Sequence, residues 1–338
     1  MKYLLPNVTF HKACLHAHSN ISDGKLSPEE LREEYKARGY NILAITDHSV
    51  MVEHQALSQA DFLMLTGVEI DLDIYSDRFG EGGRRERHLC LIGKDPKKQW
   101  IPYTDPRPIP SSVPYEATNE IAGMSRLGTT ENTNLVIAEC NRQGFLVIYN
   151  HPTGSGDRYP DYCDLQGLWG MEYRNGDTIA HGADENNGRV YDDLLDLGHH
   201  LMPVFADDTH GIISKRNGYP TLDMNWNMVG TEKLDYDSVI AALECGDLYA
   251  SCGPVIHPLT LDGDTLRLTC SPADRVQMFS NTGAHVLVHG NGGTVTEAIF
   301  KVPPKTKVYR DAYLRFIVIA PDGSYAVTRA SWADDLQP

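Results

Sequence analysis

The 338-residue chain is long enough for one large domain and one small one, with room for a buried site. Its hydrophobic fraction of 41% and charged fraction of 22% are those of a globular protein and exclude a disordered chain. A formal net charge of −16 argues against a nucleic-acid backbone as the main partner, because polyanions bind through clustered Lys and Arg. No apolar run approaches the ~20 residues needed to cross a bilayer, so we expect a cytoplasmic protein without a membrane partner.

Through about residue 250, short apolar runs alternate with helical patterns, which indicates β/α units and a mixed α/β fold. The runs that predict strands are Ala13–Leu15, Asn41–Thr46, Phe62–Glu69, His88–Ile92, Phe145–Asn150, Leu168–Tyr173 and Leu201–Ala206. A helix is predicted to begin after Ser27, with Pro28 in its first turn, and to stop at Gly39. Later helices are predicted over Asn132–Gln143, Asp193–Leu197 and Tyr236–Glu244.

The pattern changes after Gly253-Pro254, where helical periodicity disappears and alternating runs are separated by glycine and proline turns. We therefore predict a barrel over residues 1–254 and a small all-β, sandwich-like domain over residues 255–338. Residues 95–130 or thereabouts begin with a proline-rich stretch without periodicity and are predicted to form an insertion or lid. Residues 80–87, rich in glycine and arginine, match no P-loop and are predicted to form a mobile, solvated loop.

Residues of metal-ligand type follow one predicted strand after another, which is where β/α barrels place their active sites. His16 and His18 end the first strand, and two residues apart on extended backbone they point to the same face. Further candidates at strand ends are His48, Glu69, His151, Asp208 and His210. Each of them alone is more often a hydrogen-bonded core histidine or a solvated acid. Their repetition predicts one site of imidazole and carboxylate ligands, which suits zinc, manganese or iron.

At these residues the chain resembles the PHP superfamily, named for polymerase and histidinol phosphatase. The matching motifs are Leu15-His16-Ala17-His18-Ser19, Ser22-Asp23-Gly24, Ile45-Thr46-Asp47-His48-Ser49, Gly67-Val68-Glu69, His88, Asn150-His151-Pro152 and Asp208-Thr209-His210. The resemblance covers about residues 11–255, and Leu248–Pro254 with the β tail is similar to the CehA/McbA-like branch. It implies a distorted (β/α)7 barrel of PHP type, usually with three metals, and an accessory β domain.

The resemblance also implies a role for each matching residue. One metal would take His16, His18, Glu69 and Asp208, a second would share Glu69 and add His88 and His151, and a third would use Asp23, His48 and His210. His88 is an exception among them, because it precedes its apolar run whereas the others follow theirs. Asp47 and Glu172 would each orient a neighbouring histidine from outside the ligand sets. The candidates for holding a phosphate, each against the alternative of a solvated charge, are Arg174, Lys215 and Arg216.

These residues predict a metal-dependent phosphoesterase with two or three divalent ions of zinc, manganese or iron. A metal-bridging hydroxide would attack a small phosphomonoester or phosphodiester, with Glu69, Asp208 and His210 as the catalytic residues. The expected partner is a small phosphorylated molecule, and nucleic acid would enter only as a nucleotide or short oligonucleotide substrate. The alternatives are an amide, carbamate or carboxylic ester hydrolase on the same site, and a non-catalytic metal- or ligand-binding module. The oligomeric state stays open.

Overall fold

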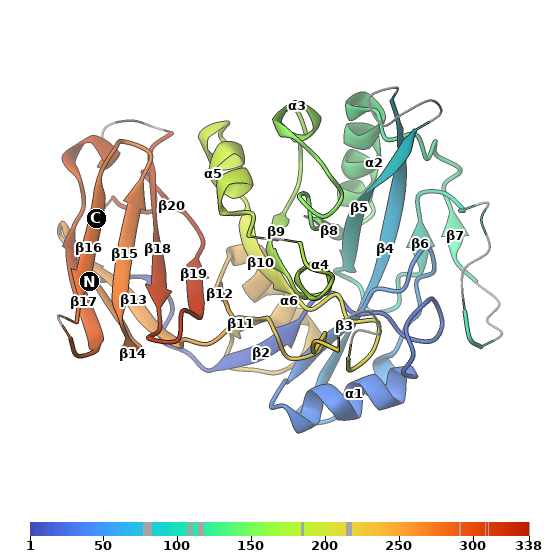
Figure 1. Ribbon diagram of the computed structural model, residues 1–338, viewed down its shortest axis with the longest axis horizontal. Helices are drawn as coiled ribbons and strands as arrows, with labels where there is room; N and C mark the ends of the chain where they lie inside the picture. The colour runs from blue at the N-terminus through green and yellow to red at the C-terminus, as the bar shows by residue number, and fades with distance from the viewer. Residues whose placement is uncertain are drawn as a thin grey trace.

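The computed structural model of the chain describes residues 1–76, 83–105, 107, 111–113, 118–183, 186–213, 218–290, 292–307, 309 and 311–337. Within them the chain has a mixed α/β fold, in which a large sheet and a smaller one are accompanied by few helices (Figure 1). No helix in these ranges is both long and apolar enough to span a bilayer.

Strands that were predicted from short apolar runs form one half of the large sheet. They are β2 (Phe10–Cys14), β3 (Ile42–Ile45), β4 (Leu63–Tyr75), β5 (Arg84–Gly93), β8 (Phe145–Tyr149), β9 (Gly170–Asn175) and β10 (Met202–Ala206). Two further strands follow, β11 (Trp226–Gly230) and β12 (Leu248–Ser251). The hydrogen-bonded order is β10-β9-β8-β5-β4-β3-β2-β11-β12. Strands β3 and β8 are buried along their whole length, which is typical of strands covered on both faces.

Strand direction decides which ends of these strands meet. Strands β2, β3 and β4 run parallel, and so do β8, β9 and β10, whereas β5 lies antiparallel between β4 and β8. The beginning of β5 therefore lies at the same edge of the sheet as the carboxyl ends of its neighbours. This reversal explains why His88 precedes its apolar run, while the other candidates follow theirs.

Four of the described helices overlap those expected from capping residues and periodicity, although the one at Gly188–Asp196 begins five residues earlier than expected, and the two short helices at Tyr159–Tyr162 and Gly176–Ala180 were not predicted. They are α1 (Pro28–Ala37), α2 (Thr130–Arg142), α3 (Tyr159–Tyr162), α4 (Gly176–Ala180), α5 (Gly188–Asp196) and α6 (Tyr236–Cys245). At α1 the Ser27 hydroxyl accepts from the backbone N–H of Glu30, and the Glu30 carboxylate accepts from the N–H of Ser27. The predicted start of this helix is therefore confirmed.

The Asn227 side chain links β10 and β11, which are not neighbours in the hydrogen-bonded order of the sheet. The Asn227 amide in β11 donates to the carbonyl of Phe205 in β10 at 2.9 Å, and its oxygen accepts from the N–H of Phe205 at 3.1 Å. One asparagine thus satisfies backbone groups that a neighbouring strand would otherwise pair. The complete (β/α)7 barrel stays a prediction.

The C-terminal strands lie at one end of the molecule in Figure 1 (orange to red). They are β13 (Ile256–Asp262), β14 (Thr265–Ala273), β15 (Arg275–Ser280), β16 (His285–His289), β17 (Val295–Lys301), β18 (Tyr313–Ile319), β19 (Tyr325–Thr328) and β20 (Ser331–Trp332). The smaller sheet has the order β1-β13-β14-β17, so that β1 (Lys2–Leu5) joins strands from the far end of the chain. Strand β12 pairs with β19, which continues the large sheet into this region. The division at residue 254 and the sandwich stay predictions.

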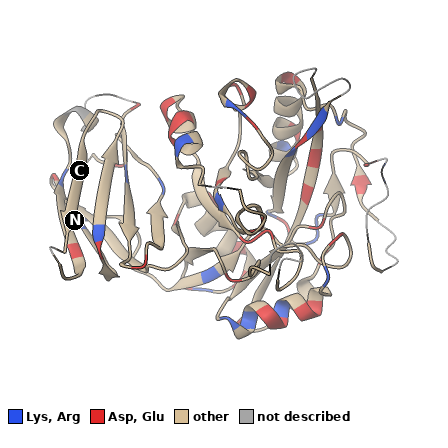
Figure 2. Cartoon of the chain, viewed as in Figure 1, with Lys and Arg blue, Asp and Glu red and all other residues tan. Residues whose placement is uncertain are grey.

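The glycine- and arginine-rich stretch at residues 80–87 corrects one expectation. Arg84–Arg87 form the start of β5 rather than a solvated loop, and residues 80–82 lie outside the described part. Arg87 is 2% exposed, and its Nε lies 3.0 Å from Oδ2 of Asp157. Figure 2 shows this basic start of β5 beside acidic positions of β4. The expectation failed because an arginine in a glycine-rich stretch is usually exposed, and the sequence does not show that Arg87 has a buried partner 70 residues away.

The predicted insertion at about 95–130 packs against the sheet in its described part. Its short strands β6 (Trp100–Ile101) and β7 (Glu120–Ile121) pair in parallel. Trp100 is buried and stacks on Phe145 of β8, with 5.6 Å between the ring centroids. A role as a lid stays a prediction.

Candidate metal centre

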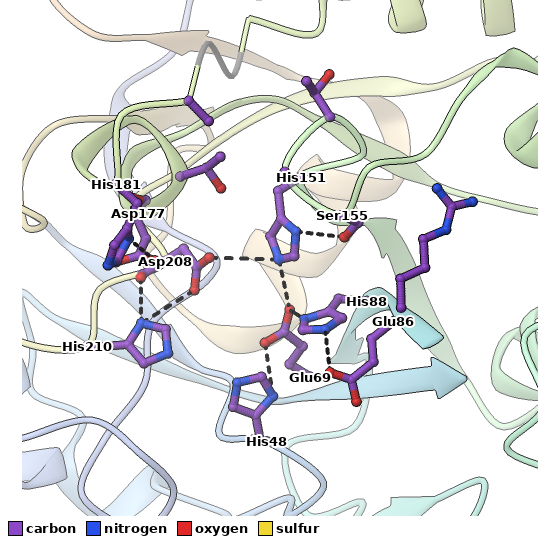
Figure 3. Close-up of a pocket in the computed structure, with 15 residues that line it drawn as sticks. His48, Glu69, Glu86, His88, His151, Ser155, Asp177, His181, Asp208 and His210 are labelled. Atoms are coloured by element: carbon purple, nitrogen blue, oxygen red, sulfur yellow. Dashed lines mark hydrogen bonds and ion pairs between the residues drawn. The ribbon is translucent and has the colours of Figure 1, made fainter. Parts of the chain in front are cut away.

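A cavity of about 610 Å³ opens at the edge where the strand ends meet (Figure 3). Among its lining residues are predicted donors from several strands: His48, Glu69, His88, His151, Asp208 and His210. His16 and His18 lie deeper, with side chains 1% and 0% exposed. Donors that are widely separated in the sequence are therefore brought together in one place.

The first predicted set converges on a small volume. Donor atoms of His16, His18, Glu69 and Asp208 all lie within 4.8 Å of one another, and all four residues are buried. Oδ1 of Asp208 is 3.1 Å from Nε2 of both histidines. Oε2 of Glu69 is 3.4 Å from Nε2 of His16 and 3.2 Å from that of His18. These spacings fit donors that surround one ion.

Glu69 lies between this set and the second predicted one. Its other oxygen, Oε1, is 3.1 Å from Nδ1 of His88 and 3.4 Å from Nε2 of His151. Its Oε2 also lies 3.3 Å from Nδ1 of His48, so the two oxygens of one carboxylate face different histidines, which is the placement that a bridging ligand requires.

The loop that follows β2 carries Asp23, the carboxylate of the third predicted set. Oδ2 of Asp23 lies 3.3 Å from Nε2 of His210 and 3.7 Å from Nε2 of His48. His18 joins these residues in one group of possible donors, which the sequence did not assign to this set. A Cβ on Gly24 would lie 2.2 Å from the carbonyl oxygen of His18, so only glycine allows the loop to pack this closely.

Two of the assembled residues have strained backbones. Asp208 has φ 53° and His151 has φ 22°, values that residues other than glycine rarely adopt. Asn175 holds Asp208 by donating from its amide to Oδ2 at 3.1 Å. Strain of this kind persists where the surroundings fix the residue, and here it turns both side chains toward the cavity.

The two predicted orienting carboxylates behave differently. Oε1 of Glu172 lies 2.6 Å from Nδ1 of His16, and its Oε2 accepts from the backbone N–H of His151, so its contact with a histidine is confirmed. Asp47 instead accepts from the backbone and hydroxyls of Ser19 and Ser22 and contacts no histidine in the described ranges. The expectation for Asp47 is therefore wrong, because four nearby donors of the loop use its oxygens.

We predict that Glu172→Gln weakens metal binding by about 10- to 100-fold, the usual effect of losing an outer partner of a ligating histidine. The amide has one acceptor oxygen instead of two, so it cannot accept both from Nδ1 of His16 and from the backbone N–H of His151. Competition of the variant and the parent with a fluorescent chelator for Mn²⁺ measures the change. Equal affinity, with equal thermal stability in chelator, contradicts the orienting role.

Arg174 is the predicted phosphate ligand that lies in the described part of the chain, and it is not among the cavity-lining residues. Arg174 donates to Oδ1 of Asn225 at 2.8 Å and lies over the ring of Tyr325, so its assignment to a phosphate is not supported. Lys215 and Arg216 lie outside the described residues. Arg85 is the cation that does line the described cavity, and it contacts the carbonyl of Gly156 and the carboxylates of Asp157 and Asp161.

Sequence reasoning missed several residues at the site. Besides Arg85, they are Asp71, Glu86, Asp177 and His181, of which all but Asp71 line the cavity. A signal was available for Asp71, because it follows Glu69 by two positions on the same strand, just as His18 follows His16. The others had no motif to distinguish them from solvated charges.

The chemistry of the centre fits a divalent cation. Nδ1 of His18, Nδ1 of His48 and Oδ1 of Asp71 are buried and have no hydrogen-bond partner in the described structure. Burial alone raises the pKa of Glu69, but the surrounding histidines hold it well below its usual range. Burial lowers the pKa of His88, yet Glu69 and Asp71 raise it to about 9. The carboxylates therefore stay charged and favour positive charge at the centre.

The comparison with known families bears on the same region. The family model of the PHP domain matches residues 15–200, more than half of the 338 residues. The chain belongs to the PHP domain family. The matched residues of the PHP domain include most of the donors, from His16 to His151, while Asp208 and His210 lie just beyond it.

This PHP domain chain is also similar to individual proteins. It is 42% identical over 60 residues to a 5'-3' exoribonuclease of Haemophilus influenzae, a match that covers 17% of this chain and 22% of that protein. A two-domain protein of Bacteroides vulgatus containing a predicted PHP-like metal-dependent phosphoesterase is 14% identical, with coverage of 98% of each chain and a TM-score of 0.45. A sulfate-bound amidohydrolase of Chromobacterium violaceum is 17% identical, with coverage of 61% of this chain and 90% of that one and a TM-score of 0.39. These similarities assign no reaction to the present chain.

Proposed function

We propose that the chain is a metal-dependent phosphoesterase that hydrolyses a small phosphomonoester or phosphodiester. The observation that supports this most is the placement of Glu69, with one oxygen toward His16 and His18 and the other toward His88 and His151. Divalent ions held by such donors lower the pKa of bound water and stabilise charge on phosphoryl oxygens. Two or three ions of zinc, manganese or iron fit the donor types.

The chain's own residues supply the positioning. Glu172 holds the His16 ring, and Asn175 holds Asp208, so these donors are fixed before a substrate enters. The catalytic assignment rests on Glu69, Asp208 and His210, of which His210 is the most exposed at 28% of its side chain. Its Nδ1 lies 3.0 Å from the carbonyl oxygen of Asp208, so Nε2 alone is free either to bind an ion or, where no ion binds there, to hold or deliver a proton.

Two finer assignments belong to the same proposal. The 60-residue similarity to an exoribonuclease supports a phosphodiester, such as a nucleotide or short oligonucleotide, as one kind of substrate. Membership of the CehA/McbA-like branch is supported by Leu248–Pro254 and by the strands that follow it.

One observation favours a second candidate. In the described lining of the cavity Arg85 is the only arginine or lysine, and it already contacts Asp157 and Asp161. A site with little free positive charge apart from its metals suits a neutral amide, carbamate or carboxylic ester as well as a phosphate.

The test is turnover by the Mn²⁺-loaded protein of p-nitrophenyl phosphate, bis-p-nitrophenyl phosphate and an aryl carbamate. We expect hydrolysis of at least one phosphate ester, lost on chelation and in His16→Ala but retained in His289→Ala, which changes an exposed histidine of β16. Turnover of the carbamate alone transfers the function to the second candidate. No turnover despite full metal loading identifies a non-catalytic binding module.

A further inference from the structure

We propose that Asp71 is a direct metal donor of this centre, in addition to the residues that the motifs imply. It would act with Glu69 and His88 on the side of the centre away from His16. The inference rests on the metal centre of the proposed function but not on the reaction.

The position of Asp71 on its strand directs it to the site. Asp71 and Glu69 are two residues apart in β4, so both side chains point to the same face of the sheet. Asp71 pairs in register with His88 on the antiparallel neighbour β5, and both residues lie beside the cluster. Side chains that are directly opposite on neighbouring strands lie within reach of one ion.

The two oxygens of Asp71 have different surroundings. Oδ1 lies 3.3 Å from Nδ1 of His48 and 3.7 Å from Nε2 of His88, and it is buried without a hydrogen-bond partner. Oδ2 faces outward to guanidinium groups, at 3.3 Å from Arg107 and 3.6 Å from Arg126. The arginines thus hold the carboxylate through Oδ2. Its Oδ1, which has no hydrogen-bond partner, faces the histidine nitrogens.

Charge around Asp71 also favours a cation. Its ion-pair network contains the carboxylates of Asp71, Asp73, Glu86 and Asp105 and the guanidinium groups of Arg84, Arg107 and Arg126. Among the described residues the carboxylates of this network outnumber its guanidinium groups by one, and the other groups that face Asp71 are the imidazoles of His48 and His88. Asp71, which is 5% exposed, is the most buried carboxylate of the network and the one next to the cluster. A buried carboxylate without full compensation is costly unless a cation accompanies it.

A direct metal donor lies within one small group of ligand atoms, whereas an orienting partner contacts a ligand from outside that group. One atom each of His48, Glu69, Asp71 and His88 lies within 4.8 Å of the others, as expected of ligands around one ion. His48 also faces Asp23 through Nε2, at 3.7 Å. A neutral imidazole has one lone pair, so His48 can ligate in only one of the two groups. If it ligates beside Asp23, then Glu69, Asp71 and His88 remain, and Asp71 is an added donor to the second predicted ion, to which Glu69 and His88 are already assigned.

The test compares Asp71→Asn with Asp73→Asn as a matched control. Asp73 lies on the same strand, loses the same charge opposite Arg126 and is not one of the clustered donors. The full chain is stripped with chelator and titrated with Mn²⁺ by calorimetry, with elemental analysis of the ions retained. Thermal unfolding in chelator verifies that both variants fold.

We expect Asp71→Asn to bind one Mn²⁺ fewer per chain than the parent, or to bind one ion at least about 100-fold more weakly, while Asp73→Asn matches the parent. This effect exceeds the ~10- to 100-fold loss produced by removing an outer partner. Full stoichiometry with a smaller loss of affinity would make Asp71 an orienting residue or a bystander and overturns the proposal. Because the readout is metal binding, a failure to hydrolyse phosphate esters leaves this result unaffected.

Discussion

Glu69→Gln is expected to remove most bound metal and most hydrolytic activity. The carboxylate lies between two histidine pairs, and the amide that replaces it has one neutral oxygen and an N–H₂ group that faces imidazole nitrogens. The losses in Mn²⁺ affinity and in kcat/KM should exceed the ~10- to 100-fold effect of outer partners. Elemental analysis after dialysis and steady-state kinetics with the ester that the parent hydrolyses provide the measurements.

Asp73→Asn again serves as the control for Glu69→Gln, since it removes a carboxylate from the same strand outside the donor groups. Unchanged metal occupancy in Glu69→Gln would mean that this residue does not bridge. Lost activity with retained metal would limit Glu69 to a role in the reaction itself.

The second large effect concerns stability. Arg87→Met is expected to lower the free energy of unfolding by about 1.5–3 kcal/mol, because the buried carboxylate of Asp157 loses one charged hydrogen-bond partner and keeps Arg85 as the other. Arg87 contacts Asp157 through Nε and donates from Nη2 to the carbonyl of Asp161 at 2.7 Å. Tyr149 also donates to Asp157, so this network ties the segment after β8 to the start of β5. Urea unfolding in chelator measures the change without a contribution from metal.

The double variant Arg87→Met/Asp157→Asn separates charge from packing. Asparagine removes the buried charge that Arg87→Met leaves behind, so the double variant should recover part of the lost stability. If it is instead less stable than Arg87→Met by the full amount expected for an independent change, the cost lies in packing and not in the ion pair.

Part of the site could be predicted because some of its donors follow the ends of apolar strands, whereas Glu69 was predicted to close its strand but lies in the middle of β4. Periodicity located β2, β3 and β10, and residue type then identified His16, His18 and Asp208. The direction of β5 could not be predicted, because an antiparallel neighbour has the same apolar pattern as a parallel one. His88 was therefore identified by its motif alone.

The prediction for Arg174 failed because of a local irregularity in β9. Alternation along β9 would put Arg174 on the same face as Glu172, toward the site. The register between β9 and β10 shifts between Glu172 and Arg174, as in a β-bulge, so the faces are exchanged beyond it. Asn175 then reaches Asp208, and Arg174 turns to Asn225. The buried ion pair of Arg87 and Asp157 was missed for another reason. A contact between two segments that are far apart in the sequence produces no periodic pattern in either of them.

The pairing of β12 with β19 has a consequence for any attempt to isolate the metal-binding part of the chain. A fragment that ended at residue 254 would leave the backbone N–H and C=O groups on one side of β12 bare, and β1 would lose β13 as well. Exposed strand edges of this kind recruit other chains and cause aggregation. The C-terminal strands thus protect the strand edges of the part of the chain that they adjoin.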